Sequence, residues 1–157
     1  MLAGAAATTA LTGAGLRAQP VGRPVYVMRH LHTPAGERDP DLTAEGRRAA
    51  AALTGLFEGK PLSAIYVSAF KRTRATVAPL AAWRRIEPKL YDPSDTPGLL
   101  RRVAAEDGPV LIVGHSNTVP DIVEGLGGRR PAPLGHDDFG DVWTVVGGEA
   151  PRERLVY

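Results

Sequence analysis

The hydrophobic and polar positions of this chain fall into two alternating patterns. The first is a short run of consecutive apolar residues, which is typical of a strand buried on both faces of a sheet. Weaker β-rich stretches follow later in the chain and suit strands at a sheet edge. Strands are predicted at residues 25–28, 64–67, 89–91, 110–113, 142–146 and 155–157.

Between these runs, apolar residues recur every three or four positions, which is the spacing of one face of a helix. In the clearest case Thr43 suits the N-cap, and Gly59 and Pro61 lie just past the end. Pro79 lies inside the second helical stretch, so we expect a kink or an early break there. Helices are predicted at residues 43–57, 71–83, 99–105 and 118–126.

The alternation of strands and helices predicts the fold class. Parallel strands need long crossover connections, and helical crossovers cover the faces of the sheet. We therefore expect an α/β protein, a three-layer sandwich whose central sheet is mostly parallel and is flanked by helices on both faces. The chain has 157 residues and no internal repeat, so residues 21–157 are expected to form a single domain.

Residues 1–20 differ from the rest of the chain, because they are nearly all Ala, Thr, Gly and Leu, with the first charge at Arg17. Two interpretations stay open. The segment is either the remnant of a secretory signal, with a plausible cleavage position after Ala18, or a disordered Ala-rich extension. The first favours an exported or periplasmic protein, and the second a cytoplasmic one. The segment lacks the continuous apolar length of a membrane span, so no stable membrane association is expected.

Composition excludes several functional classes. Hydrophobic residues make up 43% of the chain and charged residues 23%, which is ordinary globular usage. Cysteine is absent, which excludes disulfides, thiolate catalysis and Cys-based zinc sites. The net charge is only +2 and the arginines are scattered, so no nucleic-acid partner is expected.

Polar side chains follow the predicted strands at their carboxyl ends, where α/β sheets bind ligands. Arg29-His30 comes directly after the first strand, Ser68 and Arg72 follow the second, and His115-Ser116 follows the fourth. A single histidine in such a place is usually a hydrogen-bonded structural residue, and a single arginine is usually a solvated surface charge. Two histidines and two arginines at equivalent ends of different strands, beside a helix N-terminus, predict a site for a phosphoryl group.

Four segments carry a more specific pattern: Val27–His30, Asp39–Gly46, Ser68–Thr76 and Val113–Thr118. In this order they resemble the Arg-His signature, the LTxxG helix entry, the SxxxRTRxT segment and the second-histidine motif of one family. That family is the histidine phosphatase (phosphoglycerate mutase-like) superfamily, branch 1. The resemblance covers roughly Val25 to the C-terminus and implies the phosphoglycerate mutase-like fold.

The resemblance also implies a role for each matching residue. His30 is the expected nucleophile, which becomes phosphohistidine; a neutral imidazole is competent for this near pH 7. Arg29 and Arg72 are expected to bind phosphate oxygens, His115 to contact the transferring group from the other side, and Ser116 to line the same pocket. The implied protein is a small phosphatase that needs no metal or other cofactor and acts on a phosphorylated small molecule or protein.

Two features depart from the family pattern. His32 stands where many relatives have an acidic residue, and the proton donor is not evident. Relatives often supply the donor from the loop after the third strand, which makes Asp95 or Asp92 the candidate. The segment His136-Asp137-Asp138 lies in another loop that could reach the site.

Two functions other than a phosphatase stay open from the residues. His30 and His32 form an H-x-H pair that could ligate zinc together with His115 and His136, but barrel hydrolases with this pair need about 250 residues, and arginines are poor neighbours for a cation. The second alternative is a module of the same fold that binds phosphorylated ligands without hydrolysing them. A mutase is less favoured than a phosphatase, because short connections leave little room for a lid over the site.

Overall fold

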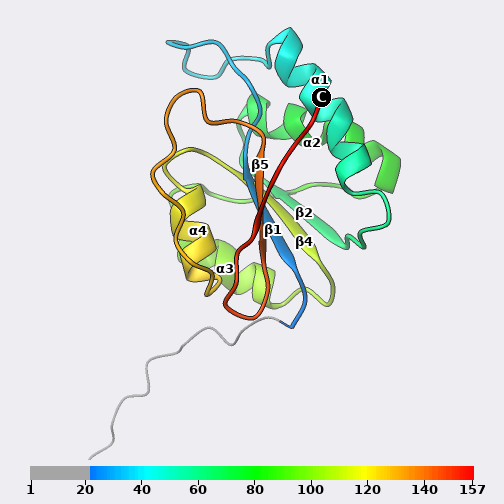
Figure 1. Cartoon of the computed structure of the whole chain (residues 1–157), viewed down its shortest axis with the longest axis vertical. Coiled ribbons are helices and arrows are strands. Elements are labelled where there is room, and N and C mark those ends of the chain that lie inside the picture. The colour runs from blue at the N-terminus through cyan, green and yellow to red at the C-terminus, as the bar shows by residue number, and fades with distance from the viewer. Residues whose placement is uncertain (1–21) are drawn as a thin grey trace, which may run out of the picture.

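The computed structural model describes residues 22–157 (Figure 1). The prediction made for residues 1–20 lies outside these residues. The elements, in chain order, are β1 (Val25–Arg29), α1 (Ala44–Leu56), β2 (Ala64–Val67), α2 (Lys71–Arg84), β3 (Lys89–Leu90), α3 (Thr96–Ala104), β4 (Val110–Gly114), α4 (Val119–Gly125), β5 (Asp141–Val145) and β6 (Arg152–Arg154).

The strands form one sheet in the order β3-β2-β4-β1-β5-β6. β1 pairs in parallel with β4, and β2 lies parallel to both β4 and β3. β5 runs antiparallel to β1, and β6 antiparallel to β5. The four parallel strands therefore have their carboxyl ends along one edge of the sheet, the upper edge in Figure 1. The predicted mostly parallel sheet is confirmed.

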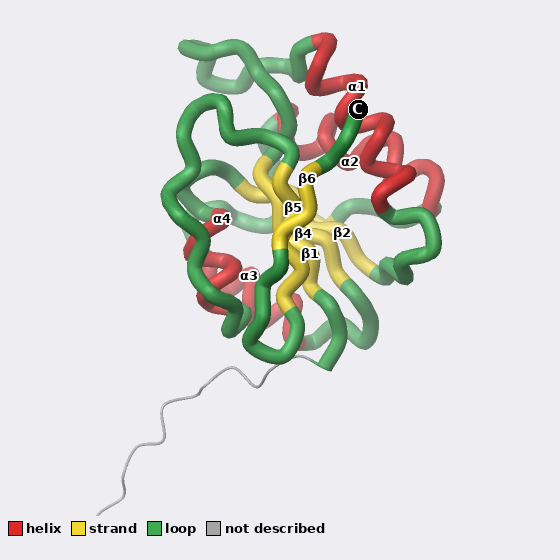
Figure 2. The backbone as a smooth tube through the Cα atoms, in the orientation of Figure 1, coloured by secondary structure: helices red, strands yellow, loops and turns green. Residues whose placement is uncertain are grey.

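Helices cover both faces of the sheet because side chains alternate between the faces along each strand. Tyr26 and Met28 of β1 belong to the core between the sheet and the helices α1 and α2. Val25 and Val27 belong to the core between the sheet and the helices α3 and α4. Figure 2 shows these two helical layers on either side of the sheet, which confirms the three-layer α/β sandwich.

Pro79 does not break α2. The helix continues to Arg84, so the predicted early break is wrong. A proline inside a helix costs about 3 kcal/mol, since its N–H is missing and its ring crowds the preceding turn. The fully buried side chains of Val77 and Leu80 lie on either side of Pro79 and hold the helix against the core. Tertiary packing therefore outweighs the local cost.

Two elements differ from the prediction by more than one residue. α3 begins at Thr96, rather than at residue 99, because the Asp95 carboxylate accepts a hydrogen bond of 2.8 Å from the Gly98 N–H and caps the helix. The last strand is β6, and residues 155–157 are not a strand. Leu155 turns into the core and is only 4% exposed, whereas the charged residues just before it form the edge strand. Charge on an edge strand is common because it discourages pairing with other chains.

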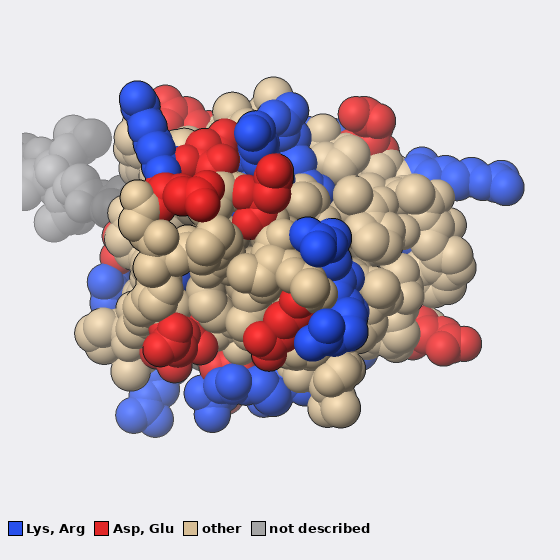
Figure 3. Space-filling model, turned by 90° about the horizontal axis from the view of Figure 1, so that it is seen from above, with Lys and Arg blue, Asp and Glu red and all other residues tan. Residues whose placement is uncertain are grey.

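Charged side chains are mixed on the face above the carboxyl edge of the sheet. Figure 3 looks down on this face and shows acidic and basic side chains interspersed with uncharged residues. No extended patch of one sign is visible there. Among residues 22–157, no helix has both the length and the apolar character needed to cross a membrane.

Candidate active site

The register of β1 and β4 brings the two predicted histidines together. Arg29 and Gly114 are paired at the ends of these neighbouring strands, so His30 and His115 follow at the same level. The centroids of their rings lie 5.5 Å apart. β2 lies on the other side of β4, and this places Ser68 Oγ 3.0 Å from His115 Nε2.

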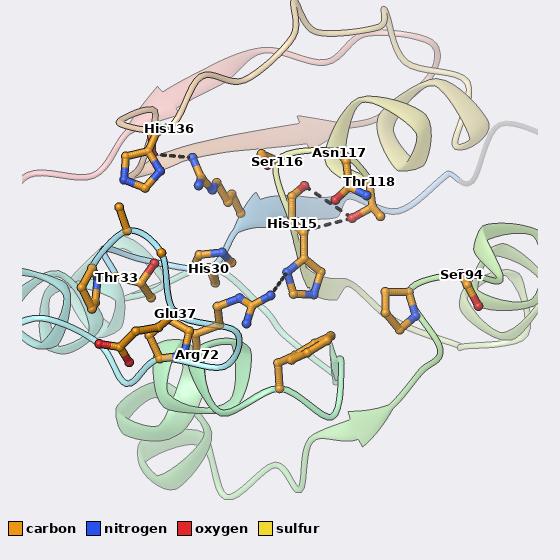
Figure 4. A pocket seen from close by; sticks show the side chains of 17 residues that line it. His30, Thr33, Glu37, Arg72, Ser94, His115, Ser116, Asn117, Thr118 and His136 are labelled. Atoms are coloured by element: carbon orange, nitrogen blue, oxygen red, sulfur yellow. Dashed lines mark hydrogen bonds between the residues drawn. The ribbon is translucent and has the colours of Figure 1, made fainter.

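A pocket of about 540 Å³ opens at this edge of the sheet (Figure 4). Five of the predicted site residues line it: Arg29, His30, Arg72, His115 and Ser116. The other lining residues come from the loops that follow β1, β3 and α4 and from the segments beside Arg72 and Ser116. They are Thr33, Pro34, Ala35, Gly36, Glu37, Pro40, Phe70, Pro93, Ser94, Asn117, Thr118 and His136.

His30 has the geometry of a nucleophile. Its Nδ1 lies 2.8 Å from the carbonyl oxygen of Leu31, and because a carbonyl can only accept, Nδ1 carries the hydrogen. The lone pair is then on Nε2, which makes no hydrogen bond within residues 22–157. Burial, with a smaller contribution from the nearby Arg29 charge, lowers the pKa of His30 to about 3. The ring is therefore neutral near pH 7, as a nucleophile must be.

His115 is oriented by partners on both sides of its ring. The Arg72 Nη2 group donates to Nδ1 at 3.3 Å, so Nδ1 carries the lone pair and Nε2–H donates to Ser68 Oγ. Ser68 Oγ is in turn 3.0 Å from Thr73 Oγ1, whose hydroxyl can donate to the carbonyl of Phe70. Burial, followed by the Arg72 charge, lowers the pKa of His115 to about 4.

Arg72 is held at the pocket by its surroundings. Its Nη1 lies 3.5 Å from the carboxylate oxygen Oδ1 of Asp39 and donates to the carbonyl of Arg38 at 3.3 Å. The guanidinium lies over the Phe70 ring, 4.3 Å from its centroid. Asp39 also accepts a hydrogen bond from the Lys71 N–H at the start of α2. The loop after β1 and the start of α2 are thus joined at the arginine predicted to bind phosphate.

Arg29 lines the pocket and also binds the loop that precedes β5. Its Nη1 donates to three carbonyl oxygens of one loop: Gly135 at 2.7 Å, His136 at 3.0 Å and Asp138 at 3.1 Å. The guanidinium also lies 4.1 Å from the centroid of the Phe139 ring. Its Nε is buried without a hydrogen-bond partner in the described part of the chain. One face of Arg29 therefore fixes the loop before β5, which the sequence pattern did not predict.

The structure does not bring the predicted proton donors into the pocket. The Asp95 carboxylate caps α3, and the Asp92 carboxylate accepts hydrogen bonds from the N–H and the hydroxyl of Ser94. The loop after β3 contributes Pro93 and Ser94 to the lining instead. Asp95 is a helix cap because its spacing to Gly98 suits an N-cap.

His32 does not line the pocket. Its Nε2 lies 3.0 Å from the Tyr157 hydroxyl and 3.7 Å from a Glu45 carboxylate oxygen, and its ring packs 4.5 Å from the Phe139 ring. The H-x-H pair of His30 and His32 therefore does not converge on one ligand position. Within residues 22–157, no group of three His, Cys, Asp or Glu residues has the arrangement of a metal site.

Sequence reasoning missed three residues that shape the site. Asp39 joins Arg72 to the loop after β1, Thr73 continues the hydrogen bonds from His115, and Phe139 packs under Arg29. Asp39 and Thr73 lie inside the segments that resemble the family motifs, so the motifs pointed to them although no role was assigned to either residue. Phe139 lies in no recognised motif, and only the tertiary structure identifies it.

A neutral, buried histidine beside two arginines at the carboxyl ends of parallel strands is suited to binding a phosphoryl group and attacking phosphorus. Residues 25–93 match the sequence model described as histidine phosphatase superfamily (branch 1). Over this segment the chain is similar to the superfamily, and this similarity supports a phosphatase as the enzymatic class. A search of curated proteins found no match to this sequence.

Solved structures share the fold. The protein histidine phosphatase SixA complexed with tungstate is 16% identical, with a TM-score of 0.65, and the match covers 83% of this chain and 94% of that one. A chain assigned as the phosphohistidine phosphatase SixA, from Nakamurella multipartitia, is 24% identical with a TM-score of 0.59, covering 88% and 100%. TTHB049 from Thermus thermophilus is 18% identical with a TM-score of 0.58, covering 85% and 99%. At these identities the structures show a common fold.

Proposed function

We propose that this protein hydrolyses phosphate monoesters or phosphoproteins through a phosphohistidine intermediate on His30, without a metal ion. The observation that carries the proposal is the fixed orientation of the His30 ring. The Leu31 carbonyl holds the hydrogen on Nδ1, which leaves the Nε2 lone pair as the attacking atom. A covalent intermediate divides one difficult displacement into two easier ones.

The arginine and histidine around His30 supply the charge that the reaction needs. A phosphate dianion entering the pocket competes with His115 Nδ1 for the Arg72 N–H groups, because anions are stronger acceptors than a neutral imidazole. His30 Nε2 then forms a bond to phosphorus as the bond to the leaving oxygen breaks. Water attacks the phosphohistidine in the second step, which releases inorganic phosphate and restores His30. Arg72 offsets the negative charge in both transition states.

A phosphorylated side chain of a protein is the substrate class that we favour. The residues at the mouth of the pocket, among them Glu37, Ser94 and Asn117, are exposed and form no cover over it. A side chain presented on a protein surface can therefore enter. The fold is shared with proteins named as phosphohistidine phosphatases, whose names suggest the same class. Comparing the rate on a phosphohistidine-bearing protein with that on free phosphohistidine measures this preference, and an equal rate would contradict it.

The activity is tested by hydrolysis of p-nitrophenyl phosphate in the presence of excess chelator. We expect turnover by the protein, none by His30→Ala, and near-normal turnover by Arg74→Ala, whose arginine is exposed on the same helix as Arg72 but does not line the pocket. Rapid quenching with labelled substrate should trap an acid-labile, alkali-stable phosphoryl group only when His30 is present. Retained activity in His30→Ala would overturn the proposal. Binding of phosphate with no trapped phosphoryl group would instead support the non-catalytic alternative.

A further inference from the structure

The position of the nucleophile fixes the side on which the leaving group departs. His30 is at the bottom of the pocket, where it is only 4% exposed. In phosphoryl transfer the attacking and leaving atoms lie roughly in line on opposite sides of phosphorus. The leaving oxygen therefore points away from the floor and toward the mouth. A proton donor for this oxygen has to stand at the rim of the pocket.

His136 stands at that rim. It lines the pocket, and its side chain is 53% exposed, in contrast to the buried His30 and His115. Figure 4 shows His136 and His115 approaching the pocket from different sides of His30. Imidazole is the side chain best suited to give and take a proton near neutral pH.

The loop that carries His136 is held in place by unusually many bonds. Arg29, directly before the nucleophile in the chain, donates to the carbonyl of His136 and to the carbonyls of Gly135 and Asp138. The Asp138 carboxylate closes the loop by accepting from the Gly135 N–H at 2.6 Å. A buried arginine that donates to three carbonyls of an exposed loop fixes the position of whatever that loop presents to the pocket.

Glu37 is the other rim residue able to release a proton. It is the one carboxylic acid that lines the pocket within the described residues. Its carboxylate extends away from the two histidines in Figure 4. Its loop is tied to the site through the neighbouring Arg38 carbonyl, which accepts from Arg72, and not through Glu37 itself. The geometry therefore favours His136.

We propose that His136 is the proton donor of the reaction, an inference that rests on the proposed function. As His30 Nε2 bonds to phosphorus and the phosphorus–oxygen bond breaks, the His136 imidazolium gives its proton to the leaving oxygen, which departs as an alcohol. The neutral His136 then accepts a proton from the water that attacks the phosphohistidine. Phosphate and the starting protonation states of both histidines result, so atoms and protons balance.

The test compares esters whose leaving groups differ in basicity. The rates are compared as kcat/KM, which reports only the first step, because the second step is common to all esters. In His136→Gln, kcat/KM for p-nitrophenyl phosphate should change little, because its leaving group departs as an anion. The kcat/KM for an alkyl phosphate, whose leaving oxygen needs the proton, should fall by about 10² or more. Arg74→Ala is the control, since its side chain is exposed and does not line the pocket, whereas Asp137 is unsuitable because its carboxylate lies 3.9 Å from His136 Nε2. That variant should keep the rates on both esters.

Two further measurements separate the possible failures. Inhibition by inorganic phosphate should be unchanged in His136→Gln if the loop keeps its place and His136 faces the leaving group. An equal loss on both esters, or no loss on the alkyl ester, would overturn the role of His136. Loss confined to the alkyl ester in Glu37→Gln would transfer the role to Glu37. Trapping of the phosphoryl group on His30 is measured in the unsubstituted protein. Failure to trap it would overturn the proposed function, whatever the result for His136→Gln.

Discussion

At the scale of single residues, the key feature of the site is the tautomer of each of its two buried histidines, His30 and His115. The Leu31 carbonyl fixes the hydrogen of His30 on Nδ1, and Arg72 and Ser68 together fix the hydrogen of His115 on Nε2. The free lone pairs are then His30 Nε2 and His115 Nδ1. In the proposed reaction, His30 Nε2 attacks phosphorus, and His115 Nδ1 lies beside Arg72, which is proposed to bind the phosphate.

The lowered pKa values of these histidines predict how stability depends on pH. The pKa of His30 is about 3 and that of His115 about 4, against an ordinary value of 6.5. Between these values the unfolded chain binds protons that the folded chain does not, so their stabilising contribution is complete above pH 6.5 and is lost as the pH falls toward 3. Unfolding by urea at a series of pH values should show this decline.

The matched variant is His115→Gln, in which one of the two groups no longer titrates. Its free energy of unfolding should fall less steeply than that of the parent between about pH 6 and pH 4. Acidic residues protonate in both proteins, so the comparison cancels their effect. Equal steepness in the two proteins would show that burial of His115 does not oppose its protonation.

At the scale of elements, α1 packs closely against the segment that follows His30. A Cβ added at Gly46 would lie 2.5 Å from the backbone carbonyl oxygen of His32, and 3.2 Å from the Leu42 Cβ. Thr43 caps the helix and accepts a hydrogen bond of 3.0 Å from the Gly46 N–H. The helix start and the loop after β1 therefore pack with no space between them.

Two glycines of α1 should respond in opposite ways to the same substitution. Gly46→Ala should destabilise the protein by about 1–3 kcal/mol and lower activity, since the backbone of the segment after His30 has to move. Gly55→Ala meets no atom within 4 Å and should stabilise by about 0.5–1 kcal/mol, because alanine favours a helix. Thermal unfolding of both variants measures the difference. A stable, fully active Gly46→Ala would contradict the close packing.

The elements also show what the sequence could and could not predict. The buried strands were predictable because β1, β2 and β4 are apolar on both faces, and their carboxyl ends located His30 and His115. The edge strand β6 was not predictable, because its exposed charged residues have no hydrophobic pattern. The hydrogen bonds from Arg29 to the loop before β5 could not be predicted either, because that loop lies more than 100 positions away in the sequence.

At the scale of the whole molecule, the charges that matter for the substrate lie inside the pocket. The net charge is +2, and charges of both signs are interspersed on the face above the site (Figure 3). Arg29 is 7% exposed, and the Arg72 side chain is 15% exposed. Long-range attraction between the protein surface and an anionic substrate is therefore weak. The attraction between a bound phosphate and the two largely buried arginines is little screened by salt.

This charge distribution predicts a weak salt dependence. The kcat/KM for a small phosphate ester should change by less than tenfold when sodium chloride rises from about 0.01 M to about 0.5 M, because salt screens exposed charges much more than buried ones. Steady-state kinetics at constant pH measures this. A steep decline in kcat/KM would mean that exposed basic residues guide the substrate to the site.

The pairing of β1 with β5 has a consequence for how the protein matures on the ribosome. Val25 near the start of the described chain pairs with Val145 close to its end, and the loop held by Arg29 lies just before β5. A nascent chain that has completed β1 to β4 already has both histidines but leaves one side of β1 without its neighbour. Because such distant contacts form slowly, we expect the pocket to become competent only after translation of the C-terminal strands, and premature termination to yield an inactive, association-prone fragment.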